Sequence, residues 1–136
     1  MKFKQYIKED INKKEYDVRN IEMETENNDN FRKVLFTGKN TQLVLMTLNP
    51  GEEIGSEIHN DTDQFFRIEQ GEGEIDVNGE KTSVKDGSSI IIVQGTKHNI
   101  INTSKDKKLK LYSLYSPPHH PPNTIHKTKE DALKEE

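Results

Sequence analysis

Four residues of this chain combine types and spacing that suit the binding of a divalent metal ion. Imidazole nitrogens, carboxylate oxygens and amide oxygens are all ligands that proteins use for such ions. The chain has no cysteine, so nitrogen and oxygen must supply every ligand. We therefore predict a site for one divalent ion, such as zinc, manganese, iron or nickel. Its predicted ligands are Glu57, His59, His98 and, as a weaker fourth ligand, Gln64.

A β-barrel is the architecture that would bring these four side chains together. Residues two apart on a strand share a face, so Glu57 and His59 are expected to point the same way. A polar turn at residues 60–63 can return the chain antiparallel, and the side chain of Gln64 then rejoins that face. His98 lies in a later β segment and completes the set only if the sheet closes on itself.

Two stretches around these residues, 51–71 and 87–102, resemble the paired motifs of the cupin superfamily. Those motifs read G-x5-H-x-H-x(3,4)-E-x6-G and G-x5-P-x-G-x2-H-x3-N. This chain departs from them at three positions, because Glu57 stands at the first His, Gln64 at the Glu and Val93 at the Pro. The positions that match in place are Gly51, His59, Gly71, Gly87, Gly95, His98 and Asn102.

The resemblance implies a small single-domain cupin, which is an all-β protein built as one antiparallel double-stranded β-helix or jelly-roll barrel. A barrel that binds metal and a barrel that kept its shape but lost its ion both remain open. Glu57 could be an exposed strand carboxylate, although an unpaired charge inside a small barrel would be expensive. Gln64 could instead hydrogen-bond only a ligand or a bound water.

Several reactions are compatible with the cupin resemblance, because a fold does not choose among chemistries. A fourth protein ligand favours Lewis-acid chemistry of the sugar-isomerase type on a small polar metabolite. One Gln, one Glu and two His also resemble, in composition, the zinc ligands of cupin-type mannose-6-phosphate isomerases, but the sequence shows no clear phosphate-binding cluster. Two imidazoles and one carboxylate with open positions would instead suit a non-haem iron dioxygenase. A non-catalytic sugar-binding or sensor module is the third alternative.

The remaining histidines lie in a proline-rich segment near the C-terminus. Adjacent side chains in an extended segment tend to point apart, so His119 and His120 are expected to be solvated or to form a lid over the barrel mouth. His126 is expected to behave similarly. None of the three is predicted to bind the metal.

The composition of the chain indicates which kinds of binding partner and which cellular compartment to expect. Hydrophobic residues make up 29% of the 136 residues and charged residues 32%, so the apolar side chains should be concentrated in a central segment. The net charge of −4, with both signs interspersed, argues against a nucleic-acid partner held by a basic face. No apolar run approaches the length of a membrane span or a signal-peptide core, so we expect a cytoplasmic protein with a small-molecule ligand and no membrane partner.

The chain divides into an N-terminal arm at residues 1–30, a barrel at 31–116 and a Pro/His-rich segment with a short helix at 117–136. The arm carries Tyr6 and Ile7, and its end at residues 22–30 is expected to be too charged to pack. Turn signals at residues 38–40 and at Asn78-Gly79 predict two β-hairpins. We expect a homodimer in which outward apolar side chains such as Phe65 and Leu114, or the N-terminal arm, cover an exposed sheet face.

Overall fold

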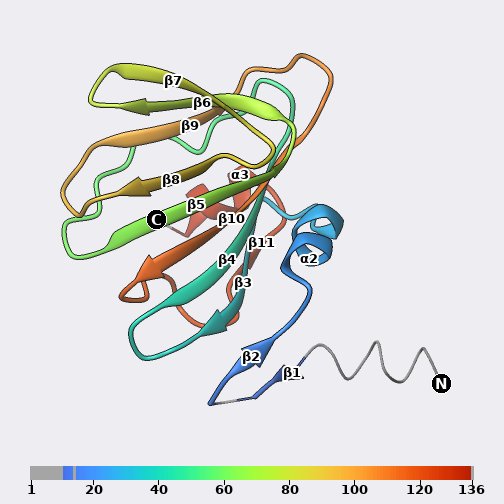
Figure 1. Ribbon diagram of the computed structural model, residues 1–136, viewed down its shortest axis with the longest axis vertical. Coiled ribbons are helices and arrows are strands. Elements are labelled where there is room, and N and C mark those ends of the chain that lie inside the picture. The colour runs from blue at the N-terminus through green and yellow to red at the C-terminus, as the bar shows by residue number, and fades with distance from the viewer. Residues whose placement is uncertain (1–10, 14, 136) are drawn as a thin grey trace.

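The computed structural model describes residues 11–13 and 15–135, so the predictions for Tyr6 and Ile7 lie outside the described residues. The chain is mostly β, with two short helices (Figure 1). The helices are α2 (Ile21–Asn27) and α3 (Lys129–Lys134). The strands are β1 (Ile11–Asn12), β2 (Asp17–Val18), β3 (Arg32–Thr37), β4 (Gln42–Leu48), β5 (Asp63–Gln70), β6 (Glu72–Val77), β7 (Glu80–Lys85), β8 (Ser89–Ile92), β9 (His98–Asn102), β10 (Leu109–Ser116) and β11 (Ile125–His126).

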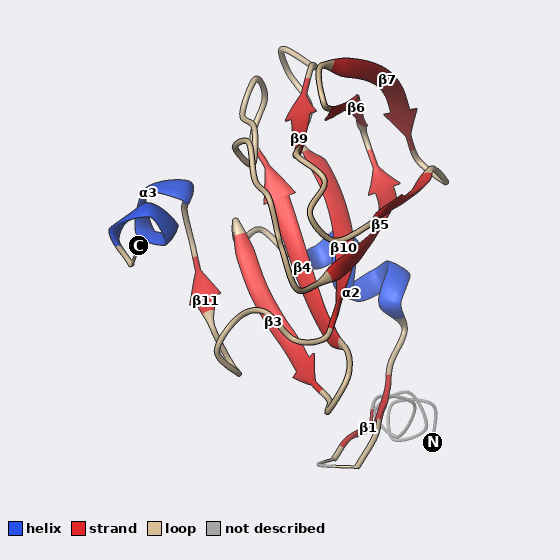
Figure 2. Cartoon of the chain, turned by 90° about the vertical axis from the view of Figure 1, so that its left-hand side faces the viewer, coloured by secondary structure: helices blue, strands red, loops and turns tan. Residues whose placement is uncertain are grey.

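Two antiparallel sheets form the body of the molecule. One sheet has the strand order β11-β3-β4-β10-β5-β8, and the other has the order β7-β6-β9. The views in Figures 1 and 2 show the smaller sheet beside the β5 and β8 edge of the larger one. Isolated bridges from Glu53 to Ile101 and from Glu57 to His98 extend the smaller sheet past β9. This arrangement confirms the predicted all-β barrel of the double-stranded β-helix type.

Alternation along the strands places apolar side chains between the sheets. On β5, Gln64, Phe66 and Ile68 are buried, whereas Phe65 and Arg67 are partly exposed, as the two-residue period predicts. Burial of each large aliphatic side chain contributes about 1.5–3 kcal/mol of hydrophobic stabilisation. The interior also includes Val44, Met46, Leu48, Ile75, Ile100, Leu109 and Leu111.

Two tight backbone positions hold the smaller sheet in shape. The predicted Asn78-Gly79 turn joins β6 to β7, and both residues have positive φ, at 51° and 91°. Such a turn matches the twist of the flanking strands. In β6, a Cβ added at Gly73 would lie 2.3 Å from the carbonyl oxygen of Ile101 on β9. Only glycine allows β6 and β9 to approach this closely.

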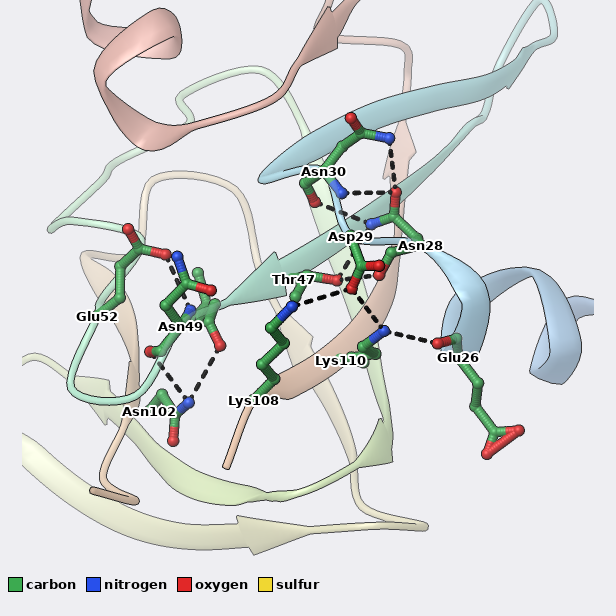
Figure 3. Close-up of polar contacts among 11 residues, drawn as sticks. Glu26, Asn28, Asp29, Asn30, Thr47, Asn49, Glu52, Asn102, Lys108 and Lys110 are labelled. Carbon is green, nitrogen blue, oxygen red and sulfur yellow. Dashed lines mark hydrogen bonds and ion pairs between the residues drawn. The ribbon is translucent and has the colours of Figure 1, made fainter. Parts of the chain in front are cut away.

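The end of the N-terminal arm packs against the barrel, so the prediction that residues 22–30 are too charged to pack is wrong. Asn20 caps α2 through its side chain, and Thr25 within the helix is fully buried. Lys110 on β10 donates to the carbonyl oxygen of Glu26 at 2.6 Å, at the C-terminal end of α2, and to Asp29 at 3.1 Å (Figure 3). Polar groups that find partners can therefore bury a helix that hydropathy alone would leave in solvent.

This helix also explains one buried charge on the outer face of β5. The two-residue period of β5 places Glu69 on the outer face, yet Glu69 is only 5% exposed because α2 lies over that face. Burial, together with nearby carboxylates that include Glu22 and Glu26, raises the pKa of Glu69 against the opposing charge of Arg67. The arm thus covers part of the sheet surface within one chain.

The C-terminal segment returns to the larger sheet. β11 pairs with β3, an addition that the proline-rich sequence did not predict. Thr128 caps the short helix α3 by accepting from the backbone N–H of Asp131, and the presence of α3 confirms the predicted C-terminal helix. The result is a segment, residues 117–128, that runs close to one end of the barrel (Figure 2).

Candidate metal centre

Three of the four predicted ligands lie together inside the barrel. Glu57, His59 and His98 each offer one ligand atom, and these atoms all lie within 4.8 Å of one another. Two donors bound to one ion at about 2.1 Å lie at most about 4.2 Å apart, so small shifts would suffice to seat an ion. His59 and His98 are buried, and Glu57 is partly exposed.

Backbone pairing with β9, rather than a regular strand, positions Glu57. The expectation that Glu57 and His59 lie on one strand is wrong, because this segment forms only an isolated bridge. The N–H of Glu57 donates to the carbonyl oxygen of His98 at 2.9 Å, and the N–H of His98 donates back at 3.0 Å. The N–H of Gly95 holds the carbonyl oxygen of His59 at 2.7 Å. These three bonds fix both ends of the ligand segment to the second motif.

The His98 ring has a defined tautomer. Nδ1 lies 2.9 Å from the carbonyl oxygen of Thr96, and since a carbonyl only accepts, Nδ1 carries the proton and donates. Nε2 of the neutral ring is therefore left with its lone pair toward the barrel interior. An N–H donated to a backbone carbonyl is the usual way in which a protein orients a metal-binding histidine.

Gln64 directs its amide oxygen at the same nitrogen. Its Nε2 donates to Oγ of Ser113 on β10 at 2.9 Å, and its Oε1 lies 3.2 Å from Nε2 of His98. The structure therefore brings the predicted fourth residue next to the cluster. Both Oε1 of Gln64 and Nε2 of His98 carry lone pairs and neither donates a proton. A cation bound by both atoms would stabilise this arrangement.

His59 has a buried ring nitrogen that lacks a hydrogen-bond partner. Its Nε2 lies 3.5 Å from Oε1 of Glu57 without the geometry of a hydrogen bond. A buried polar atom left in this state costs about 1–3 kcal/mol. The donor set of two imidazoles, one carboxylate and one amide oxygen, together with this unsatisfied atom, fits a divalent ion.

Electrostatics keep the ligands in their metal-binding protonation states. Burial acts to raise the pKa of Glu57, but the neighbouring His59 and the positive charge of Arg32 outweigh it and lower the pKa below the usual value. Burial lowers the pKa of His98, against the opposing effect of its bond to Thr96. Both changes favour an ionised carboxylate and a neutral imidazole at neutral pH.

His119 and His120 form the lid that was one of the two alternatives predicted for them, and this lid reaches the cluster. His126 is only 5% exposed, so the similar prediction for it is wrong. The His119 ring centroid lies 4.4 Å from that of His59, although His119 is exposed on its other side. Gln42, fully buried on β4, accepts from the backbone N–H of both His119 and His120, at 3.1 and 2.9 Å. His120 Nε2 lies 3.3 Å from the hydroxyl of the fully buried Tyr115. Spacing could not reveal these contacts, because they depend on how residues 117–122 fold back.

Arg32 is the site residue that sequence reasoning missed. This first residue of β3 is only 7% exposed, and its charge acts on Glu57 and on both lid histidines. A cavity of about 230 Å³ lies between β3, Glu57 and the C-terminal segment. Its lining includes Arg32, Glu57, His119, His120, His126 and Glu135.

Comparison with known proteins places the chain in a family. The sequence profile of the family described as "Cupin domain" matches residues 44–115, which contain all four predicted ligands. The chain belongs to the cupin domain family. This confirms the resemblance drawn from the two motifs.

Two curated relatives are similar over most of this chain, and both are described as uncharacterized. YrkC of Bacillus subtilis (strain 168) is 48% identical over 125 residues, covering 88% of this chain and 67% of the relative. L612 of Acanthamoeba polyphaga mimivirus is 46% identical over 112 residues, covering 79% of this chain and 69% of the relative. These relatives are consistent with the family assignment, and their descriptions name no reaction.

Solved structures show the same architecture. BH2720 of Bacillus halodurans has a TM-score of 0.84 and 44% identity, covering 86% of this chain and 92% of that one. A predicted oxalate decarboxylase of Thermotoga maritima has a TM-score of 0.55 and 26% identity, covering 59% and 69% of the two chains. KdgF of Halomonas sp., at 23% identity and a TM-score of 0.60 over 65% and 78%, shares the fold alone.

The described residues contain no helix that is long and apolar enough to cross a membrane.

Proposed function

We propose that this cupin holds one divalent metal ion and acts on a small polar metabolite. The observation that carries the proposal is the convergence of Glu57, His59 and His98 on one point, with His59 Nε2 buried and lacking a hydrogen-bond partner. Gln64 would contribute its amide oxygen as a fourth, weaker ligand. When bound, the ion would supply Lewis-acid chemistry by polarising a carbonyl or hydroxyl oxygen of the substrate.

The chain's own residues support this role in three ways. The bond from His98 Nδ1 to Thr96 keeps Nε2 free of a proton, and the bond from Gln64 Nε2 to Ser113 keeps the amide oxygen pointed inward. The lid formed by His119 and His120 shields one side of the cluster and limits the entry of water. The cavity of about 230 Å³ is small, which suits a small metabolite.

A non-haem iron dioxygenase is the second candidate. Two imidazoles and one carboxylate are the ligand set of such sites, and the donor atoms that lie within 4.8 Å of one another come from two histidines and one glutamate. Gln64 decides between the two candidates, because a fourth protein ligand occupies a position that dioxygen chemistry would need. The predicted oxalate decarboxylase of Thermotoga maritima adds decarboxylation to the reactions worth testing.

Proton exchange on a carbon acid tests the proposal. The protein, loaded in turn with zinc, manganese, nickel and iron, is incubated with dihydroxyacetone in D₂O, and deuterium incorporation is followed by proton NMR. Lewis-acid chemistry predicts exchange that His98→Ala abolishes and Asn40→Ala, in an exposed turn outside the ligand cluster, retains. Oxygen consumption by the iron form would instead favour the dioxygenase, and ligand binding without either reaction would favour a sensor module.

A further inference from the structure

Arg32 is a buried cation whose guanidinium carbon lies 5.2 Å from the centroid of the Phe31 ring and which has no carboxylate partner among the described residues. A guanidinium has five N–H donors and stays charged at any pH that a protein tolerates. The side chain of Arg32 makes one hydrogen bond in the described part of the chain, from Nη1 to Nδ1 of His126 at 3.3 Å. Its Nε is buried and has no hydrogen-bond partner. Because burying an unpaired charge is costly, this arrangement calls for a compensating anion.

The carboxylates nearby do not supply that anion. Among the residues the structure describes, none lies within ion-pair distance of Arg32. Glu135 accepts from Nε2 of His126 at 2.8 Å, and its side chain is 67% exposed, so solvent screens its charge. Glu57 is directed at His59 and His98. A metal ion bound there would further reduce the negative charge available to Arg32.

The cavity places this cation beside the metal cluster. Arg32 and Glu57 line the same space of about 230 Å³, and His120 of the C-terminal segment also lines it. A small molecule held at Arg32 would therefore lie next to the predicted ligands. Arginine is the side chain best suited to pair with a planar carboxylate. A phosphate dianion would call for more than one cation, and Arg32 is the one arginine or lysine among the described residues that line the cavity.

We propose that Arg32 binds the carboxylate group of a small organic acid in this cavity, with the rest of the acid directed at the metal cluster. This narrows the substrate class to small carboxylic acids and rests on the proposed function for the role of the ion. The carboxylate site itself depends on Arg32 and the lid. The segment at residues 117–128 forms one wall, so the ligand would also hold that segment against β3.

Calorimetry with malonate as the probe tests the carboxylate site. Malonate is titrated into the full chain in metal-loaded and metal-stripped forms, with malonamide as the neutral analogue of the same shape. We expect malonate to bind and malonamide not to bind. Arg32→Gln should weaken malonate binding by about thirtyfold or more, because the malonate carboxylate then loses the guanidinium that pairs with it. Lys33→Gln is the matched control, since it removes the same charge from the next residue, which points to the other face of β3.

Metal content measured on the same samples separates the two proposals. Arg32→Gln should keep its metal, since removing a nearby positive charge does not weaken the binding of a cation. If malonate binds through Arg32 and the protein holds no metal, the carboxylate site stands and the metal proposal fails. Equal binding of malonamide, or unchanged malonate binding by Arg32→Gln, would overturn the carboxylate site whatever the metal content.

A measurement on the wild-type protein avoids dependence on whether Arg32→Gln folds. The chain has three arginines, at positions 19, 32 and 67, so ¹⁵N-arginine labelling gives few Nε–H signals to assign. Malonate should shift the Arg32 signal and leave the other two in place. A titration in which the Arg32 signal does not move would contradict the proposal.

Discussion

Nε2 of His98 and Oε1 of Gln64 face each other at 3.2 Å across the barrel interior, and neither atom is in a position to donate. The proton of the His98 ring is committed to Thr96, and the amide N–H₂ of Gln64 is directed at Ser113. Burial lowers the pKa of His98, so protonating Nε2 is an unfavourable way to relieve this contact. A metal ion bound by both atoms would relieve it.

Substitutions at Gln64 test this pair. Gln64→Ala should weaken metal affinity by about 10- to 100-fold while leaving a site, because the three stronger ligands remain. Gln64→Glu adds a negative charge at the same position and should tighten binding of a hard cation such as manganese by at least about tenfold. Competition against a chelating dye measures both affinities. Identical affinities for wild type and Gln64→Glu would show that this side chain does not face the ion.

The lid histidine His120 predicts how stability depends on pH. Burial and the charge of Arg32 lower its pKa to about 3 in the folded chain, from an ordinary value of 6.5. The unfolded chain therefore binds an extra proton between these two values, so His120 reduces the free energy of unfolding progressively as pH falls from about 6.5 toward about 3. Its contribution to stability is fully present above the unfolded pKa.

Urea unfolding of the metal-stripped protein at several pH values measures this effect. His120→Gln should show a shallower loss of stability between pH 6.5 and pH 4 than wild type, because the titrating group is gone. The comparison with wild type removes the contribution of carboxylates, which both proteins share. Parallel pH profiles would rule out the neutral, buried state of His120.

Asn102, the last residue of the second motif, has a structural role. Its side-chain N–H₂ group donates to the carbonyl oxygens of Leu48, Asn49 and Lys107, at 3.1, 3.1 and 2.8 Å. Figure 3 shows the bond to Asn49. Asn102→Ala leaves these acceptors without their donor and should reduce the free energy of unfolding by about 3 kcal/mol. Asn40→Ala, in an exposed turn, should change it by less than about 0.5 kcal/mol. Equal effects in denaturant titrations would contradict this role.

A homodimer remains a prediction, and the structure suggests a different face for it. Phe65 and Leu114, the side chains expected at the interface, are partly buried within the chain. Ile91 and Val93 are 72% and 63% exposed, at and just beyond the edge strand β8. An exposed apolar sheet edge favours association. Light scattering at micromolar concentration should report a dimer for wild type and a monomer for Ile91→Lys, and a wild-type monomer would contradict the prediction.

The sequence predicted the barrel and the ligand cluster because both follow from local rules. Strand alternation, the Asn78-Gly79 turn and the spacing within the two motifs fix which faces meet. The predicted hairpin between β3 and β4 and the buried face of β5 follow from the same rules. Glu57 reached the predicted place by a different route, through a single bridge to His98 rather than a strand.

The features that sequence reasoning missed depend on long-range packing of polar residues. Arg32 lies 94 residues before its hydrogen-bond partner His126 in the sequence, and no spacing rule connects the two residues. Helix α2 looked too charged to pack, yet Lys110 binds its C-terminal end and Asp29. The side-chain oxygen of Gln42 accepts from the backbone N–H groups of the two lid histidines. Contacts of this kind leave no pattern in the sequence. Composition indicates how polar a segment is, but not which partners satisfy it.

Metal content per chain tests the central claim most directly. The protein is purified without added metal and without affinity tags that bind metal, and the wild type is compared with His98→Ala and His126→Ala by elemental mass spectrometry. We expect about one divalent ion per chain in the wild type and in His126→Ala, and far less in His98→Ala, since a ligand from the second motif is lost. Full metal content in His98→Ala, or wild-type protein that binds no divalent ion even after one is supplied, would contradict the assignment.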